Sequence, residues 1–394
     1  MALPTVMPPL LLGSATFNVQ HVADPLSMPY RSIVSRALQL GIRAFDTSPY
    51  YGPAEILLGD ALNCLHPRPP RESIFLVTKA GRIDASTFDY SAAYIRYSVN
   101  RSLKRLGTDY LDLVHLHDVE FVSAKEVLDG ILTLRQLRDE GKIRFVGISG
   151  FPVHLLCDRA HEILQETGQP LDAVLSYGYH TIQNPVIGQP IANGQPSPLQ
   201  RFKEVGVQVV LNASILGMGL LTQNGIPDSS VTTVILPDSK AAQIAKWHPA
   251  PAGLRAACRT LSSYTSTSPT SDRLEGIALR WALESYAKMA ADAGLGVTLP
   301  NGQSIGASVL GVTTVDELEH TVREWNEVLG GPSGRGQHVK DLVEHKMWDS
   351  LGSWKGFAWK SPDEGWFNQR GDKTGTVPDG DELATEIQRR LDKV

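Results

Sequence analysis

A closed barrel of eight parallel strands, each followed by a helix, is the α/β fold that this sequence predicts. Three observations favour this (β/α)8 class, also called a TIM barrel. Short apolar runs alternate with amphipathic helical stretches, as in parallel sheets that carry helices on the outside. Eight such pairs fit between residues 9 and 330, and eight strands close this kind of barrel. No G-x-G-x-x-G motif follows an early strand, which disfavours the alternative, a doubly wound open sheet.

The first four pairs follow from apolar periodicity and from the glycines that end helical runs, such as Gly41 and Gly107. The expected strands cover residues 10–17, 44–48, 74–79 and 111–117. The expected helices cover residues 30–40, 54–63, 90–106 and 124–140. The helix at 90–106 has a basic outer face, which is more simply a solvated surface than a binding site.

The last four pairs continue the same alternation. The expected strands cover residues 143–149, 171–179, 207–213 and 308–312, and the expected helices cover residues 153–167, 199–204, 276–285 and 315–329. Two long loops, 182–198 and 223–253, follow strand ends, where ligands of such barrels bind. The stretch 289–306 is rich in small residues and is expected to be an insertion at the opposite face.

Two parts of the chain are expected to differ in role. Residues 1–330 should form the barrel, and residues 331–394 a C-terminal extension that begins with a glycine-rich linker at 330–336. The extension contains the tryptophans Trp348, Trp354, Trp359 and Trp366. Four such residues argue against disorder, so we expect the extension to dock on the barrel.

Composition narrows the class of partner. The formal net charge of −5 leaves no basic footprint for nucleic acid or for an anionic membrane surface, so a small neutral or weakly charged ligand is expected. The cysteines Cys64, Cys157 and Cys258 are too few and too far apart to indicate disulfides or a metal site. The N-terminus lacks the pattern of a signal peptide, and no window reaches the ~20 apolar residues of a membrane span. A soluble, cytoplasmic protein is expected, with its oligomeric state left open.

Polar residues that can exchange protons end three of the early strands. Asp46 and Tyr51 follow the second strand, Lys79 ends the third, and His117 ends the fourth. All strands of such a barrel end at one face, so these side chains can converge. A tyrosine ionises near ~10 in water and needs a nearby cation to act as a base, which Lys79 would supply. Asp46 would keep Lys79 charged, and His117 would donate a hydrogen bond to the substrate oxygen.

The motifs Asp-Thr-Ser-x-Tyr-Tyr-Gly, Val-Thr-Lys and Asp-Leu-x-x-x-His, together and in this order, resemble those of the aldo-keto reductase superfamily. The resemblance implies that Asp46, Tyr51, Lys79 and His117 form the catalytic tetrad. Several neighbours are alternatives or additions to that set. Tyr50 is the rival phenol and more simply lines the substrate pocket; His115 is expected on the opposite face of its strand; Asp118 could contact substrate or be structural.

The same resemblance implies a nicotinamide dinucleotide bound at the ends of the later strands. Ser149 matches a carboxamide-binding serine, although Gly150 replaces the usual Asn. Ser176 occupies the place of the usual Gln, and Ala213 that of a tyrosine that stacks on the nicotinamide. The residues expected to cover the pyrophosphate are Ser214, Leu216 and Met218. Ordinary turn residues remain the alternative for these positions.

The last strand bears on the choice between NAD and NADP. Members that prefer NADP carry Lys and Arg after this strand, whereas Gly311, Thr313 and Glu317 lie in a segment without a cation. A glutamate would repel a 2′-phosphate and can accept hydrogen bonds from a ribose hydroxyl. NAD is therefore the expected cofactor.

The motifs Val-Leu-Ser-Tyr-x-Tyr, Ala-Ser-x-Leu-x-Met-Gly-Leu-Leu-Thr and Trp-His-Pro-Ala resemble the L-galactose dehydrogenase branch, which includes fungal NAD-dependent D-arabinose 1-dehydrogenases. This implies oxidation of an aldose such as D-arabinose or L-galactose at C1 to the lactone, in an ascorbate-type biosynthesis. One alternative is an NADPH-dependent reductase of aldehydes such as pyridoxal. Another, of a different class, is a non-catalytic cofactor-binding protein.

Overall fold

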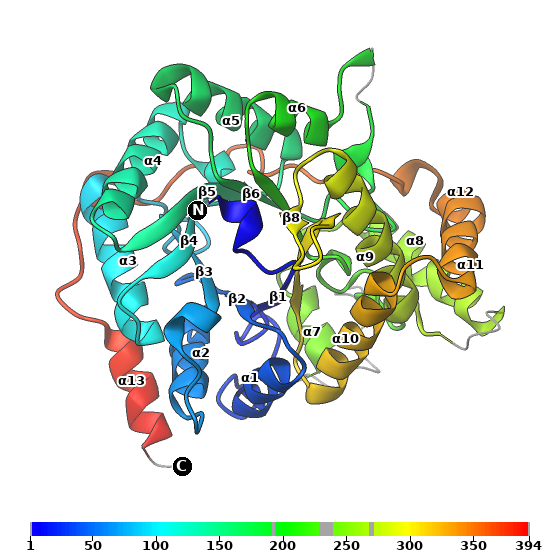
Figure 1. Ribbon diagram of the computed structural model, residues 1–394, viewed down its shortest axis with the longest axis horizontal. Helices are drawn as coiled ribbons and strands as arrows, with labels where there is room; N and C mark the ends of the chain where they lie inside the picture. Colours follow the sequence, from blue (N-terminus) through cyan, green and yellow to red (C-terminus); the bar gives the residue numbers. More distant parts are fainter. Residues whose placement is uncertain (1, 191–193, 228–238, 268–271, 393–394) are drawn as a thin grey trace.

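Eight parallel strands close into a barrel in the computed structural model, which describes residues 2–190, 194–227, 239–267 and 272–392. Around the barrel, the order is β1-β10-β7-β6-β5-β4-β3-β2, as the predicted (β/α)8 fold requires (Figure 1). The barrel strands are β1 (Leu10–Gly13), β2 (Ala44–Asp46), β3 (Phe75–Ala80), β4 (Leu111–His117), β5 (Ile143–Gly150), β6 (Ala173–Tyr177), β7 (Val209–Ala213) and β10 (Ala307–Gly311).

Helices surround the strands on the outside of the barrel (Figure 1). Those that alternate with the strands are α1 (Tyr30–Gln39), α2 (Ala54–Asn63), α3 (Ala92–Leu106), α4 (Ala124–Asp139), α5 (Val153–Thr167), α6 (Pro198–Glu204), α9 (Leu274–Asp292) and α10 (Val315–Leu329). Local signals define several ends. Ser123 and Glu126 form a capping box at the start of α4, and Gly107 and Gly168 end α3 and α5 in the left-handed conformation.

Every residue of β2, β3 and β4 is buried, because side chains fill the barrel inside and helices cover it outside. The first strand is shorter than the predicted 10–17. After Gly13, the Ser14 N–H donates to the Asp46 carbonyl at 2.8 Å, and the Phe17 N–H donates back to Ser14. The chain therefore turns after Gly13 instead of continuing as a strand.

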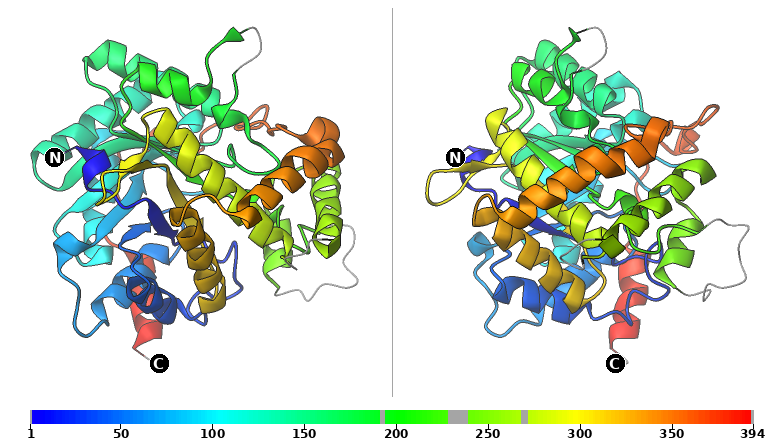
Figure 2. Two further views of the ribbon diagram at one scale, coloured as in Figure 1. Left: turned by 45° about the vertical axis from the view of Figure 1, so that its right-hand side comes forward. Right: turned by 90° about the vertical axis from the view of Figure 1, so that its right-hand side faces the viewer.

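The predicted loop 223–253 contains helical structure. It holds α7 (Lys240–Ala245), and α8 (Ala252–Thr260) begins at its end; its residues 228–238, like 191–193 of the other long loop, lie outside the described residues. The predicted insertion 289–306 supplies the end of α9 and a hairpin of β8 (Val297–Thr298) and β9 (Ser304–Ile305). This hairpin lies beside the N-terminal turn Leu3–Thr5, at the end of the barrel opposite to the strand-end loops (Figures 1 and 2).

The C-terminal extension lies against the barrel. It contains α11 (Gly334–Leu342), a π-helical turn (Val343–Met347), α12 (Trp348–Leu351) and α13 (Glu382–Leu391). The predicted linker 330–336 is shorter than expected, because Ser333 caps α11. Far along the chain, Asp381 pairs with Arg105 of α3 at 2.6 Å, which ties α13 to the side of the barrel (Figure 1). Among the described helices, none is long and apolar enough to cross a membrane.

Candidate active site

The four residues of the predicted tetrad meet at the carboxyl end of the barrel. Asp46 ends β2, Lys79 is the penultimate residue of β3, His117 ends β4, and Tyr51 lies in the turn between β2 and α2. The Lys79 ammonium is 2.7 Å from Asp46 Oδ1 and 4.9 Å from the centroid of the Tyr51 ring. The Tyr51 and His117 rings are 5.6 Å apart and nearly perpendicular. The arrangement places an acid, an ammonium, a phenol and an imidazole around one space.

Lys79 and Asp46 form an ion pair inside the barrel. Their side chains are 1% and 5% exposed, and Lys79 Nζ also donates to the Thr47 carbonyl at 3.0 Å. Burial lowers the pKa of Lys79, but the Asp46 carboxylate and Tyr51 more than compensate, so the pKa lies above its ordinary value. Burial raises the pKa of Asp46, against the opposing effect of Lys79. The ammonium is therefore charged, and Asp46 is the group that keeps it so.

The phenol of Tyr51 is neutral at physiological pH. Burial raises its pKa to about 12, although the Lys79 charge acts in the other direction. The charge of Lys79 lowers the pKa of Tyr51, in the expected direction, but the loss of hydration on burial has the larger effect. Tyr51 is thus poised as a proton donor, and as a base only when the solution is alkaline or a further positive charge arrives.

His117 is held by Ser48, for which the sequence indicated no role at the site. The Ser48 hydroxyl is 2.9 Å from His117 Nδ1, and it accepts a hydrogen bond from the Tyr50 N–H. We assign the ring proton to Nε2, because this nitrogen faces an acceptor, the Asp118 carboxylate, at 3.6 Å; the Ser48 hydroxyl then donates to Nδ1. Burial, then Lys79, lowers the pKa of His117 well below its ordinary value, so the ring is neutral. Its Nε2–H can donate to a substrate oxygen.

Arg82 is a site residue that the sequence reasoning missed. It lies after β3, with its guanidinium 3.7 Å from the Tyr50 ring centroid, and it donates to the Tyr50 hydroxyl at 3.0 Å. It also forms an ion pair with Asp118. The Oδ2 atom of Asp118 lies 3.6 Å from His117 Nε2. Tyr50 and Asp118 therefore lie beside the tetrad, and their contact with a substrate stays a prediction. A cation three residues after Lys79 was the available signal.

His115 points to the same side of β4 as His117, so its expected placement on the opposite face is wrong. Side chains two residues apart in a strand share a face, and the register pairs His115 with Lys79 and with Gly147. The imidazole is fully buried beneath the tetrad, and neither of its ring nitrogens has a hydrogen-bond partner within the described part of the chain. Gly147 leaves room for it, since a Cβ there would lie 2.7 Å from the His115 ring.

The strand register separates two of the predicted cofactor residues. Ser149 pairs with His117 and so faces the inside of the barrel, where its hydroxyl donates to the Leu116 carbonyl at 3.2 Å. Ser176 pairs instead with Gly150 and Asn212, and the Asn212 amide donates to the loop after β6 under α9. The Ser176 hydroxyl therefore faces the helices outside the barrel. This orientation does not support the predicted contact with a nicotinamide.

Two features account for the departures at Gly150 and Ala213. A Cβ on Gly150 would lie 2.4 Å from the Glu120 carboxylate, so a larger residue at this position would displace the buried end of the Glu120 side chain. Ala213 pairs with Tyr177 of β6, which faces the inside of the barrel. Burial, then Asp118, raises the pKa of Tyr177 well above its ordinary value. An aromatic ring is therefore present at this level of the barrel, but on the neighbouring strand.

The loop after β7 has an unusual backbone. Ser214 and Met218 adopt positive φ angles of 55° and 52°, and Gly217 between them has 56°. Within the described residues, Asp118 is the third non-glycine residue with positive φ, and it also follows a barrel strand. Such strained positions cluster at binding sites. Ser214, Leu216 and Met218 are partly exposed, as residues that cover a bound group must be.

A cation does lie at the end of β10, contrary to what the local sequence indicated. Lys240 of α7 is 3.0 Å from Glu317 and 3.2 Å from the Thr313 hydroxyl. Glu317 also accepts hydrogen bonds from the Thr313 N–H and hydroxyl at 2.7 and 3.0 Å. Burial would raise the pKa of Glu317, but Lys240 and Thr313 hold it below its ordinary value. Gly311 is exposed directly before this cluster.

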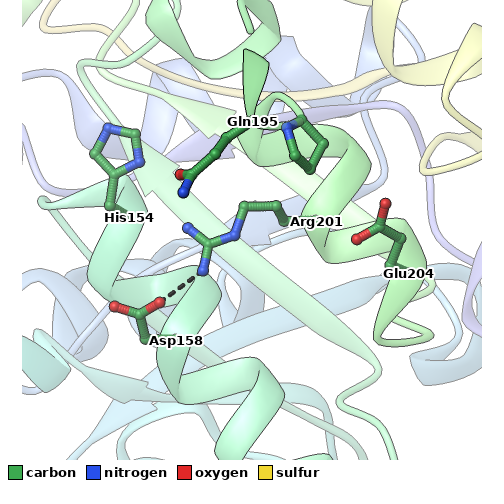
Figure 3. A pocket seen from close by; sticks show the side chains of 6 residues that line it. His154, Asp158, Gln195, Arg201 and Glu204 are labelled. Atoms are coloured by element: carbon green, nitrogen blue, oxygen red, sulfur yellow. Dashed lines mark hydrogen bonds and ion pairs between the residues drawn. The ribbon is translucent and has the colours of Figure 1, made fainter. Parts of the chain in front are cut away.

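A separate hollow of about 570 Å³ lies on the outer surface at α5 and α6 (Figure 3). Its lining includes His154, Asp158 and Arg201, and Arg201 is already paired with Asp158 at 2.6 Å. None of the predicted site residues lines it. The hollow is therefore unrelated to the tetrad.

Comparison with known proteins agrees with this geometry. A model of the aldo/keto reductase family matches residues 9–330. D-arabinose 1-dehydrogenase of Saccharomyces cerevisiae is 34% identical over 339 residues, which cover 86% of this chain and 88% of that protein. L-galactose dehydrogenase of Arabidopsis thaliana is 30% identical over 349 residues, 84% of this chain and 93% of that protein.

Solved structures show the same architecture at lower identity. Glycerol dehydrogenase from Gluconobacter oxydans aligns with a TM-score of 0.56 and 21% identity, over 91% of this chain and 98% of that one. An aldo-keto reductase from Bacillus halodurans in its holo form aligns with a TM-score of 0.54 and 23% identity, over 85% and 91%. At these identities the likeness concerns the fold alone.

Proposed function

The chain belongs to the aldo/keto reductase family, and from this membership we propose that it oxidises a free aldose at C1 to the lactone with NAD. D-arabinose and L-galactose are the candidate substrates, since relatives at 34% and 30% identity carry the names of dehydrogenases for these sugars. The observation that carries the proposal is the meeting of Tyr51, Lys79, Asp46 and His117 at one end of the barrel.

In the proposed reaction, the C1 hydroxyl of the sugar lies between Tyr51 and His117. Tyr51 takes the hydroxyl proton, and the charged Lys79 stabilises the phenolate needed for that step. The His117 Nε2–H donates to the same oxygen and fixes its direction, while Ser48 holds the ring. Bound NAD supplies the hydride acceptor. In the opposite direction, the neutral phenol of Tyr51 would donate the proton.

Three features at the later strand ends support a dinucleotide site. Ser149 lies on the inner face beside His117, the strained loop 214–218 is partly exposed, and Lys240 with Glu317 lies beyond β10. We propose NAD over NADP because Glu317 neutralises Lys240, so the pair has no surplus positive charge for a 2′-phosphate.

The cofactor preference gives a direct prediction. Changing Glu317 to Gln should lower the Kd for NADP by about tenfold, because the Lys240 ammonium is then free to pair with the phosphate. Binding of NAD should change by less than about threefold. Titration calorimetry with each dinucleotide measures both values without turnover. The double variant K240A/E317Q should lose the gain, and an unchanged NADP affinity in E317Q would refute the role of the pair.

The dependence on pH gives a second prediction. Oxidation needs the Tyr51 phenolate, and burial raises the pKa of this phenol to about 12. The positive nicotinamide of bound NAD opposes this shift, but the reactive fraction still increases as pH rises, and kcat/KM for aldose oxidation should climb by up to about tenfold per unit between roughly pH 7 and 10. Reduction of the lactone or of an aldehyde uses the neutral phenol, so its kcat/KM should stay level over that range. An oxidation rate already constant at pH 7 would contradict this assignment.

A substrate panel tests the proposal against its alternatives. Absorbance of reduced nicotinamide is followed with NAD or NADP and with D-arabinose, L-galactose and their epimers. NADH formation with an aldose is expected. Consumption of NADPH with pyridoxal and no oxidation of sugars would favour a reductase, and dinucleotide binding without any turnover would favour a non-catalytic protein.

We also propose a cytoplasmic location, in keeping with the unpaired thiols of Cys64, Cys157 and Cys258, and a role in ascorbate-type synthesis.

A further inference from the structure

A segment of the C-terminal extension crosses the strand-end loops of the barrel. We call residues 354–370 the strap. It lies outside the matched family region and passes behind the barrel in Figure 1, at the end opposite to the β8–β9 hairpin (Figure 2). At its start, the Gln183 amide donates to the carbonyls of Trp354 and Phe357 at 2.6 and 3.0 Å. This contact joins the strap to the loop after β6.

The strap then contacts the loops after β7, β5 and β4. The Trp359 indole stacks on Phe151, with 4.5 Å between ring centroids and 7° between planes, and lies 5.4 Å from His248. The Ser361 hydroxyl donates to Glu120 at 3.1 Å. These contacts place an aromatic side chain of the extension among loops that surround the tetrad.

Its last part is fixed to the loops after β4 and β3. Trp366 packs edge-on against Phe121, with 4.9 Å between the ring centroids. Asn368 exchanges hydrogen bonds with the backbone of Phe88. Arg370 forms an ion pair with Asp89 at 2.9 Å. A segment held at so many points is a fixed part of this end of the barrel.

Together with the loops, the strap completes a ring of contacts around the tetrad. Gln20 bonds to the Tyr50 hydroxyl at 3.5 Å, and Tyr50 bonds to Arg82, which pairs with Asp118. On the other side, the Trp247 indole donates to the Gln20 carbonyl at 2.8 Å. The neighbouring His248 meets Trp359, which closes the ring from the loop after β1 to the strap.

The charges on this ring favour a neutral ligand. Arg82 is compensated by Asp118, and burial followed by the charge of Asp118 raises the pKa of Glu120 to about 8. Oxygen atoms of Asp118 and Glu120 are buried without partners in the described residues. A sugar phosphate would meet the Asp118 carboxylate, and Arg82 is already paired with that carboxylate, so the ring favours a neutral sugar.

We propose that the strap forms the wall of the substrate pocket opposite the tetrad, and that Trp359 binds the apolar face of a sugar in its ring form. One face of the Trp359 indole lies on Phe151, and the side chain remains partly exposed. Aromatic faces pack well against flat apolar surfaces, as sugar rings present with their C–H groups. The proposal rests on the proposed function and specifies the substrate as an unphosphorylated, cyclic sugar.

The test compares Trp359→Leu, Trp359→Phe and Phe367→Ala. Phe367 is in the strap but 71% exposed, so F367A is the matched control. W359L keeps apolar volume on Phe151 without a ring, and it should raise KM for the aldose by about tenfold, with kcat and the Kd for NAD changed by less than about threefold. W359F and F367A should stay within about threefold of native in all three constants.

The outcomes separate the two claims. An unchanged aldose KM in W359L, with a native-like melting temperature and native activity present, overturns the role of Trp359 and leaves the dehydrogenase reading intact. A native protein that oxidises no aldose overturns both. If W359L does not fold, the native protein and W359F are compared instead. For each protein, kcat/KM is measured with an aldose and with the phosphate ester of that aldose. Equal values for the two substrates in both proteins would contradict a pocket selective for neutral sugars.

Discussion

Replacement of Tyr51 by phenylalanine should lower kcat for aldose oxidation by roughly 10²- to 10⁴-fold, the usual contribution of a positioned acid or base. The change removes one oxygen atom from a ring that packs against Lys79 and His117, so the barrel should be unaffected. NAD should bind Y51F with unchanged affinity. Steady-state kinetics and calorimetric titration of NAD measure the two effects on the same sample.

Tyr50 provides the matched control for this prediction. Its hydroxyl bonds to Arg82 and Gln20, on the rim of the site, and its ring is 6.1 Å from that of Tyr51. Y50F should lower kcat by less than about tenfold. If Y50F were the more damaging change, Tyr50 would be the proton-transfer group and the assignment of Tyr51 would be wrong.

Replacement of Lys79 by methionine should have the largest combined effect on activity and stability. The ammonium is the charge that stabilises the Tyr51 phenolate, so kcat should fall by at least about 10²-fold. Its loss also leaves the Asp46 carboxylate buried without a partner, which typically costs roughly 3–5 kcal/mol of the free energy of unfolding. Urea denaturation and kinetics of K79M measure both losses.

The double variant D46N/K79M separates the two effects. It removes both charges, so no buried carboxylate is left unpaired, and most of the lost stability should return. Activity should not return, because the phenolate still lacks its cation. A double variant as unstable as K79M would show that the cost arises from packing around Lys79 instead of from charge.

Much of the fold could be predicted because local signals and long-range packing agree. Several elements have the predicted bounds, namely Ala54–Asn63, Leu111–His117, Val153–Thr167 and Val315–Leu329. Buried runs of apolar residues and clear turn residues mark these segments. The tetrad was also predictable, because parallel strands end at one face of a barrel and the four residues stand at such ends.

What the sequence could not show depends on residues far apart in the chain. Lys240 reaches Glu317 across 77 positions, so inspection of the last strand alone indicated no cation. The orientation of Ser176 follows from its register with Gly150, and a shift by one residue reverses the face of a strand. The strap lacks periodicity, because its side chains pack singly onto different loops.

The proposed reaction removes hydride from C1 of an unphosphorylated aldose. The most direct measurement uses D-arabinose or L-galactose deuterated at C1, with NAD and the native enzyme, and follows both products by NMR. We expect the oxidised sugar to be a lactone without deuterium at C1, and the reduced dinucleotide to carry one deuterium on its nicotinamide ring. Deuterium retained in an oxidised sugar, or transfer only in the direction of aldehyde reduction, would contradict the proposed reaction.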